Sequence, residues 1–282
     1  MKYLSLAAAS LAAFVALPAA AQETAPPKDV TVTGSVALVS DYRLRGVSQT
    51  DKEMAVQGGL TITHKSGLYV GTWASNLSGW GTFGGSNMEL DLIGGYKMPI
   101  GGGGALDVGL TWYMYPGGAS KTDFAEPYVK LSGTAGPVSM LAGVAYAPKQ
   151  QALGKWYNNA AAYATGVPNN PGKGNDNLYV WGDGSTALPG TPITLKGHIG
   201  HSNGNRGLGP NGTSAAPTGA YWDWLLGADL AIKGTPLTLS AAYIDTDISR
   251  AESAYIYPNF ASTKNGSSIA GSTAVFTLTA AF

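Results

Sequence analysis

WDWLLGADLAI, residues 222–232, is the stretch that decides the fold. Every second residue from Trp222 to Ile232 is apolar, whereas Asp223 and Asp229 lie at positions between them. Successive side chains of a β-strand point to opposite faces, so a period of two is typical of a strand with one apolar and one polar face. We therefore expect a strand here, with different surroundings on its two sides.

The same alternation recurs along the chain, for example in residues 88–97, 106–114 and 193–199. The pattern predicts about twelve strands, and their phase stays ambiguous near Leu68 and Asn177. The expected strands begin near Val30, Met54, Leu68, Asn87, Gly104, Phe124, Pro137, Asn177, Thr191, Ala220, Pro236 and Ser272.

The connections between these strands alternate in length. The short ones are residues 64–67, 99–103, 133–136, 184–190 and 233–235. The others are mostly longer: residues 46–52, 76–86, 116–123, 148–176, 202–219 and 246–271. Short turns at one edge and long loops at the other are typical of an up-and-down transmembrane barrel. The alternative, a large soluble β-protein with its apolar faces buried inside, leaves this asymmetry unexplained.

The N-terminus has the pattern of an export signal. Lys2 precedes an apolar run from Leu4 to Leu17, and three alanines end at Ala21. We expect residues 1–21 to be a signal peptide, residues 22–29 a periplasmic segment and residues 30–282 the barrel. The predicted fold class is therefore all-β: a transmembrane, antiparallel, up-and-down β-barrel located in the bacterial outer membrane.

Composition limits the partners of the chain. It has no cysteine, so disulfides and thiolate metal sites are excluded. Charged residues make up 12% of the chain and the formal net charge is zero, which argues against nucleic acid as a partner. We expect no metal and no cofactor.

Charges predict which face of each strand meets lipid. A Lys or Arg that faces lipid at mid-bilayer costs about 2–4 kcal/mol, so the charged face should line the lumen. The predicted pore-lining residues are Asp41, Arg43, Glu89, Asp91, Asp107, Lys130, Lys196, His198, Asp223 and Asp229. The alternative for these charges is a salt-bridged plug that rigidifies a closed barrel.

Aromatic residues on the apolar faces predict an interfacial girdle. The expected members are Tyr42, Tyr96, Trp112, Tyr146, Trp222, Trp224, Tyr243 and Phe282. The chain ends on alternate apolar residues from Ala274 to Phe282. This looks like the terminal strand signal that the outer-membrane barrel insertion machinery reads in many bacterial barrels, so we expect that machinery as a partner.

GHIGHSNG, residues 197–204, resembles the His-x-Ser-Asn-Gly motif of outer-membrane phospholipase A. Here His201 is directly adjacent to Ser202, and adjacent strand residues point to opposite faces. His198 shares a face with Ser202 but lies about 13 Å away along a strand. A bulge after Gly200 could change this phase. We nevertheless expect no catalytic residues and no enzymatic activity.

Several stretches in the first third resemble the TorF-like porin family, proteobacterial outer-membrane proteins described as a conserved family of unknown function. They are residues 40–50 (SDYRLRGVSQT), 57–59 (QGG), 71–76 (GTWASN) and 89–96 (ELDLIGGY). The resemblance extends over most of the mature chain, although residues 149–175 look like an insertion. It implies a barrel and a porin, and it supplies no substrate and no catalytic residues.

Twelve strands lie between small filled barrels and wide porins, so we expect a narrow channel for small hydrophilic solutes or ions. The expected partners are these solutes and outer-membrane lipid. The lumen charges predict a weakly cation-preferring or nearly unselective pore. A non-conducting barrel whose long extracellular loops bind a ligand or partner stays open as an alternative, and an outer-membrane lipid hydrolase is a more distant one.

Overall fold

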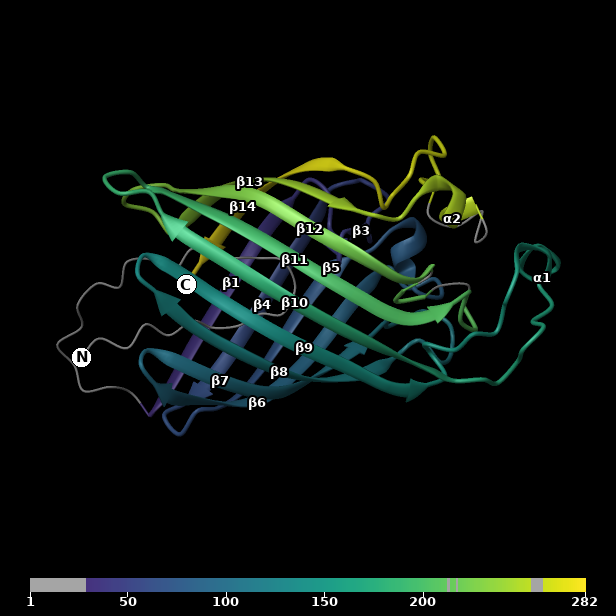
Figure 1. Ribbon diagram of the computed structural model, residues 1–282, viewed down its shortest axis with the longest axis horizontal. Helices are drawn as coiled ribbons and strands as arrows, with labels where there is room; N and C mark the ends of the chain where they lie inside the picture. Colours follow the sequence, from purple (N-terminus) through teal and green to yellow (C-terminus); the bar gives the residue numbers. More distant parts are fainter. Residues whose placement is uncertain (1–28, 212–213, 217, 255–260) are drawn as a thin grey trace.

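The computed structural model describes residues 29–211, 214–216, 218–254 and 261–282. The expected signal peptide and residues 22–28 of the expected periplasmic segment lie outside the described residues. Twelve long strands form one closed antiparallel barrel (Figure 1). They are β1 (Val30–Val39), β4 (Ala55–His64), β5 (Leu68–Asn76), β6 (Met88–Gly101), β7 (Gly104–Met114), β8 (Phe124–Ala135), β9 (Val138–Gln150), β10 (Asn175–Ala187), β11 (Ile193–Arg206), β12 (Thr218–Ala231), β13 (Leu237–Thr246) and β14 (Thr273–Ala281).

Each long strand pairs with its neighbours in sequence, and β1 closes the barrel on β14. At this seam Val36 lies opposite Ala280 and Leu38 opposite Leu278. Closure leaves no unpaired sheet edge, so the barrel wall satisfies its own backbone hydrogen bonds. The predicted twelve-stranded up-and-down barrel is therefore confirmed.

Short turns lie at one end of the barrel and long connections at the other (Figure 1). A two-residue turn joins β6 to β7 through Gly102 and Gly103, whose φ angles of 58° and 80° match a hairpin turn with positive φ at both positions. The long connections contain β2 (Arg43–Leu44), β3 (Val47–Ser48), the 3-10 helix η1 (Gly79–Thr82), α1 (Ala160–Thr165) and α2 (Arg250–Ala254). Within the described chain, no helix has the length and hydropathy to cross a bilayer.

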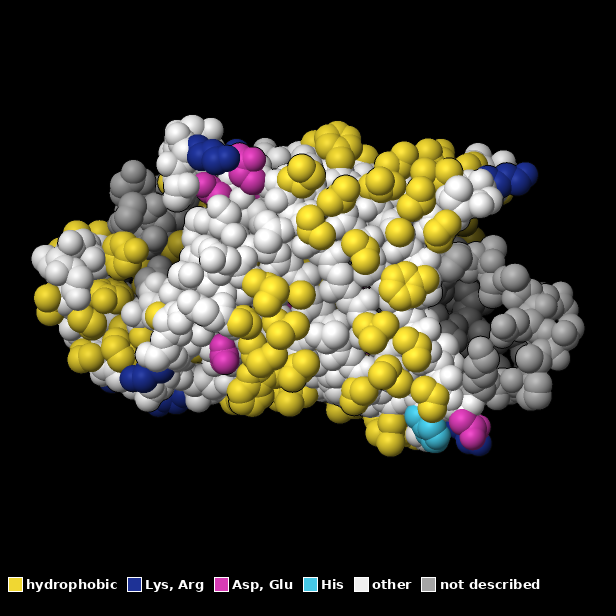
Figure 2. Space-filling view, turned by 180° about the vertical axis from the view of Figure 1, so that it is seen from behind, with side chains coloured by type: hydrophobic (Ala, Val, Ile, Leu, Met, Phe, Trp, Pro, Cys, Tyr) yellow, Lys and Arg dark blue, Asp and Glu magenta, His cyan; other side chains and the backbone are white. Residues whose placement is uncertain are grey.

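Strand β12 has the two faces that its sequence predicts. Leu226 is 67% exposed on the outer face, whereas Asp223 and Asp229 are each 3% exposed on the inner face. Hydrophobic side chains cover much of the middle of the wall, and most Lys, Arg, Asp and Glu side chains in this view lie towards the two ends (Figure 2). The wall is thus apolar outside and polar inside.

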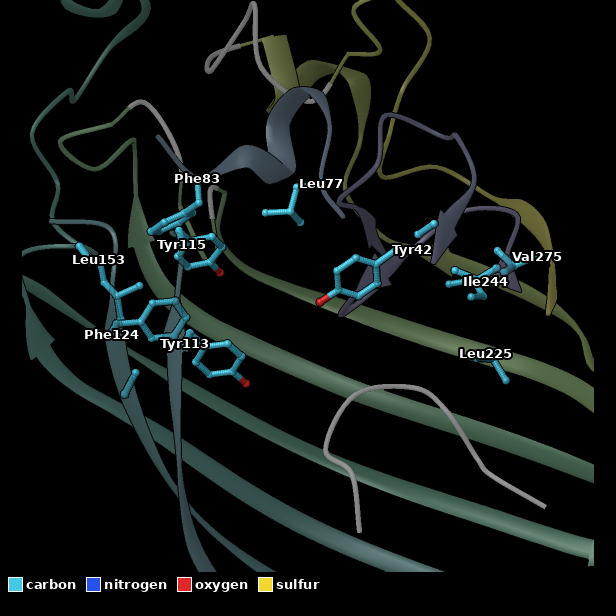
Figure 3. Packing of buried hydrophobic residues seen from close by; sticks show 14 residues of the cluster. Tyr42, Leu77, Phe83, Tyr113, Tyr115, Phe124, Leu153, Leu225, Ile244 and Val275 are labelled. Carbon is cyan, nitrogen blue, oxygen red and sulfur yellow. The ribbon is translucent and has the colours of Figure 1, made fainter. Parts of the chain in front are cut away.

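The largest apolar cluster lies inside the barrel, at the end with the long connections (Figure 3). Its members come from opposite walls and from four of the long connections. They include Val39, Tyr42, Leu77, Phe83, Tyr113, Tyr115, Phe124, Leu153, Leu225, Ile244 and Val275. Packed apolar side chains therefore occupy part of the long-loop half of the interior.

Candidate functional site in the barrel interior

Residues 40–54, between β1 and β4, are called the inner segment because residues 41–51 fold into the barrel. Strand β1 ends at Val39, and the short strands β2 and β3 pair with each other through Arg43 and Ser48. From Asp41 to Asp51 every residue is buried or half-buried. Residues 46–52 belong to a connection between strands, as expected, but this connection turns into the lumen.

Hydrogen bonds inside the inner segment fix its shape. Asp41 accepts the Ser48 hydroxyl at 2.5 Å and the Nε of Arg43 at 2.8 Å. Gly46 has a φ of +80°, and a Cβ at this position would lie 2.3 Å from Cγ2 of Thr246 on β13. Glycine therefore allows the tip of the inner segment to rest against the wall.

The connection between β13 and β14 holds the inner segment in place. The backbone N–H of Ser48 donates to the carbonyl of Ile269 at 2.9 Å, and Arg43 Nη1 donates to the carbonyl of Gly271 at 2.8 Å. The Asp51 carboxylate accepts the backbone N–H of Thr263 at 3.0 Å and also its hydroxyl. These contacts join segments more than 200 residues apart.

Arg45 extends from the inner segment to the opposite wall of the barrel. Its Nη2 donates to both carboxylate oxygens of Glu126 on β8, each at 2.7 Å, and its guanidinium lies 4.1 Å from the ring centroid of Tyr179 on β10. Burial alone would lower the pKa of this guanidinium, but the charge of Glu126 raises it, and the resulting pKa is above its ordinary value. Arg45 thus stays charged and crosses the lumen.

Glu89 and Asp91 lie under the inner segment on the inward face of β6. The Tyr42 hydroxyl donates to Oε2 of Glu89 at 3.1 Å. Oε1 of Glu89 and Oδ1 of Asp91 are buried and have no hydrogen-bond partner among the described residues. Neither carboxylate forms an ion pair within that part of the chain. Two buried carboxyl groups therefore lack a counter-charge among the described residues.

The other buried charges of the wall are paired. Lys196 Nζ lies 2.5 Å from Oδ1 of Asp229, and Lys130 Nζ lies 3.7 Å from Oδ2 of Asp107. Asp107 also accepts the Tyr69 hydroxyl at 2.7 Å.

His198 lies between two carboxylates, with Nδ1 2.6 Å from Asp183 and Nε2 3.1 Å from Asp223. Only a doubly protonated ring donates from both nitrogens, so this arrangement favours an imidazolium. The Tyr179 hydroxyl lies 2.9 Å from Nε2 of the same ring.

The inner face of the wall becomes more accessible towards the short-turn end. On β1, β4, β13 and β14 the inward positions near the long loops are buried, as at Val39, Ala55, Ile244 and Val275. Further along the same strands the inward positions are half-buried hydroxyl residues: Thr33, Ser35, Thr61, Thr63, Ser240, Thr277 and Thr279. The ion pairs lie on the other arc of the wall, from β7 to β12. In the short-turn half of the lumen, hydroxyl side chains therefore line one arc of the wall, on β1, β4, β13 and β14, and ion pairs line the other arc, from β7 to β12.

All ten predicted pore-lining residues face the interior. Glu89, Asp91, Asp107, Lys130, Lys196, His198, Asp223 and Asp229 lie on wall strands. Asp41 and Arg43 do not, because they belong to the inner segment. That these residues line a path for solutes stays a prediction.

Tyr42 is not part of an aromatic girdle, and this prediction is wrong. The strand was expected to continue past Val39, but the chain turns inward, so Tyr42 packs on Trp73 with ring centroids 5.2 Å apart. The exposed members are Tyr96, Trp112, Tyr146, Trp222, Tyr243 and Phe282. Trp224 is half-buried opposite Asp245 on the outer face.

Sequence reasoning missed Arg45, Tyr179 and Asp183. Asp183 and Tyr179 lie on β10, where the hydrophobic phase was ambiguous. Arg45 lies beyond the end of β1, where alternation carries no information. The signal that could have found Arg45 is the density of polar residues around glycine in residues 40–50, since an exposed loop has no need of so many hydrogen-bonding groups.

His201 and Ser202 point to opposite faces of β11, as predicted. The His201 ring lies against Trp222 with centroids 4.7 Å apart, whereas Ser202 Oγ points inward and lies 3.3 Å from Oδ1 of Asn177. His198 is bound by its two carboxylates. The geometry therefore contains no serine–histidine dyad at this position.

Several solved structures are similar to this chain. The NanC porin is 9% identical, with coverage of 89% of this chain and 99% of that chain, and a TM-score of 0.53. The KdgM porin in complex with disordered oligogalacturonate is 5% identical, with coverage of 89% and 97% and a TM-score of 0.49. The outer membrane channel DcaP of Acinetobacter baumannii is 11% identical, with coverage of 90% and 97% and a TM-score of 0.41.

The likeness to the NanC porin shows that the chain has a porin-like barrel fold. No curated protein sequence matches the chain. A family model matches residues 21–282, and the chain therefore belongs to the family described as "Bacterial protein of unknown function (Gcw_chp)".

Proposed function

We propose that this protein is an outer-membrane channel of bacteria that lets small hydrophilic solutes or ions diffuse passively, with the inner segment as its constriction. The observation that carries the proposal is the two-sided wall: ionisable residues such as Asp107 and Lys196 lie inside a closed barrel with an apolar outer surface. A charged interior is costly unless water or counter-charges fill it. The resemblance to the TorF-like porin family supports the same function.

The lumen favours small polar solutes over apolar ones. Its short-turn half offers hydroxyl groups on one arc and Lys–Asp pairs on the other. Its long-loop half is narrowed by the inner segment, with Arg45 bound to Glu126 across the lumen. Solutes would therefore pass along a polar wall and then beside a charged constriction.

Single-cysteine labelling tests this proposal, because the chain has no native cysteine. Thr61 faces the lumen and is half-buried, whereas Leu60, its neighbour on β4, is 37% exposed on the outer face. We expect stepwise conductance from the refolded protein in planar bilayers. A charged thiol reagent should lower the conductance of Thr61→Cys and leave that of Leu60→Cys unchanged. Equal responses of the two variants would contradict the lumen assignment.

The apolar cluster in the long-loop half favours a second candidate, a non-conducting barrel whose outer loops bind a ligand or partner. Tyr113, Phe124 and Ile244 reach this cluster from different walls. This second function predicts no conductance steps from the wild type or from a variant in which Arg45 no longer holds the inner segment.

A further inference from the structure

The inner segment covers two carboxylates for which the described chain supplies no counter-charge. Glu89 and Asp91 are 0% and 1% exposed, and both face inward from β6. They are two residues apart on one strand, so their Cα atoms are about 7 Å apart. One oxygen of each, Oε1 of Glu89 and Oδ1 of Asp91, is buried without a hydrogen-bond partner among the described residues. The nearby pair of Arg45 and Glu126 is already neutral within itself.

Oxygen-bearing and aromatic side chains surround these two carboxylates. In the register of the sheet, Ser75 lies opposite Glu89, and Asp91 lies between Trp73 and Tyr113. Tyr42 and Tyr115 lie outside the wall strands, and burial raises the pKa of both phenols. The nearby carboxylates of Glu89 and Asp91 raise these two pKa values further. Both carboxylates therefore act electrostatically on Tyr42 of the inner segment and on Tyr115.

Two neighbouring buried carboxyl groups ionise only when something offsets the penalty for each desolvated ion, which is several kcal/mol. A bound cation would remove this penalty and would use the free oxygens directly. We propose that Glu89 and Asp91 bind one hard metal cation, of which Ca²⁺ is the best match, and that this cation holds the inner segment on the wall.

The chemistry of the donors selects this class of ion. Carboxylate and hydroxyl oxygens suit Ca²⁺, which takes 6–8 oxygen ligands at about 2.3–2.6 Å. No three His, Cys, Asp or Glu side chains of the described residues are grouped as metal ligands. The remaining ligands of the ion are therefore hydroxyl, carbonyl and water oxygens. Two carboxylates carry the charge that one divalent ion neutralises.

The site links the wall to the inner segment, because Glu89 belongs to β6 and its partner Tyr42 belongs to the inner segment. Binding of the ion should therefore stabilise the folded barrel. This inference goes beyond the proposed channel function and does not depend on it, since ion binding and thermal stability are measured without any conductance.

Terbium luminescence tests the site directly. Tb³⁺ replaces Ca²⁺ at oxygen sites and emits when a nearby Trp or Tyr ring is excited. Trp73, Tyr42 and Tyr115 are the aromatic residues near the proposed site. We expect saturable emission from the metal-stripped, refolded full chain, and Ca²⁺ should displace it. We also expect Ca²⁺ at a hundredfold excess over its Kd to raise the Tm by about 5–10 °C.

The decisive variant is Glu89→Gln with Asp91→Asn, which keeps the shapes of the two side chains and removes their ability to carry a charge. It should lose both the emission and the Ca²⁺-dependent rise in Tm. The matched control is Asp229→Asn, a buried lumen carboxylate that has a lysine partner, and it should keep both responses. If the double variant does not refold, Asp91→Asn alone should still lose affinity for Tb³⁺.

Two outcomes would overturn the proposal. The first is equal emission from wild type and the double variant, because the ion would then bind elsewhere. The second is a Tm that Ca²⁺ leaves unchanged at pH 7 but that rises as the pH falls towards 5, because protons rather than a metal ion would then neutralise the two carboxylates.

Discussion

Arg45 and Glu126 join the inner segment to the wall of the barrel, with Nη2 of the guanidinium 2.7 Å from both carboxylate oxygens. Arg45 belongs to the inner segment between β1 and β4, and Glu126 belongs to β8 on the far side of the closed sheet. Both side chains are largely buried, at 10% and 4% exposure. The ion pair therefore crosses the lumen and holds the inner segment over it.

Arg45→Ala should widen the constriction. Removing one partner of a buried ion pair typically costs about 3–5 kcal/mol, which favours release of the inner segment from β8. We expect a larger single-channel conductance in planar bilayers than that of the wild type. The control is Lys52→Ala, which removes an exposed cation of the same segment and should leave the conductance unchanged.

The reversed pair, Arg45→Glu with Glu126→Arg, should return the conductance towards the wild-type value. Unchanged conductance of Arg45→Ala would show that this contact does not limit the path.

Lys196→Met should destabilise the barrel strongly, because it leaves the carboxylate of Asp229 buried without its ion pair. We expect the free energy of unfolding to fall by about 3–5 kcal/mol, measured by denaturant titration in lipid vesicles. The control is Lys264→Met, which breaks the exposed pair with Glu53 and should cost less than about 1 kcal/mol. Lys196→Met with Asp229→Leu should recover most of the loss. Equal effects of the two lysine variants would contradict the burial of this pair.

The alternation of apolar and polar residues was enough to predict the barrel wall. In β12 and β6 this alternation is regular, because one face lies on the apolar outside of the barrel and the other on its polar inside. Strand number, strand starts and the division into short turns and long loops follow from the same constraint. The inward position of Asp107, Lys130 and Lys196 was predictable for the same reason.

The inner segment was not predictable in this way. Residues 40–54 have no sustained period of two, and their place in the lumen depends on contacts with residues far away in sequence, such as Ile269 and Glu126. Tyr42 was misplaced because the strand pattern was extended past Val39. Local patterns determine the wall, whereas only tertiary contacts determine what fills it.

Lys97→Glu should shift the pore towards cations. Lys97 is a half-buried inward residue of β6, and the register places Asp107 beside it and Lys130 beyond. The substitution changes the net charge of these three side chains, Lys97, Asp107 and Lys130, from positive to negative. We expect the reversal potential in a KCl gradient to move towards cation preference, with a larger shift at low salt because screening is weaker.

The control for this variant is Lys65→Glu in an exposed turn at the same end of the barrel. Its reversal potential should stay close to that of the wild type. A Lys97→Glu channel with wild-type selectivity would mean that ions do not pass along this arc of the wall.

Gly34→Val should impair closure of the barrel at the seam between β1 and β14. Gly34 and Phe282 exchange two backbone hydrogen bonds of 2.8 and 2.9 Å, and a Cβ on Gly34 would lie 2.8 Å from two ring atoms of Phe282. A valine must therefore displace the terminal aromatic ring that we expect the insertion machinery to read. We expect a smaller fraction of folded, heat-modifiable barrel in outer-membrane fractions.

Gly58→Val is the matched control for this seam, because a Cβ there meets nothing closer than 3.5 Å and an added apolar group on the outer face is tolerated. It should assemble like the wild type. Phe282→Ala should reduce assembly by itself, and adding Gly34→Val to it should cause little further loss, since both changes remove the same contact. Fully additive losses would mean that Gly34 acts through the carbonyl of Gly59, which lies 2.9 Å from the same Cβ position, and not through the terminal ring.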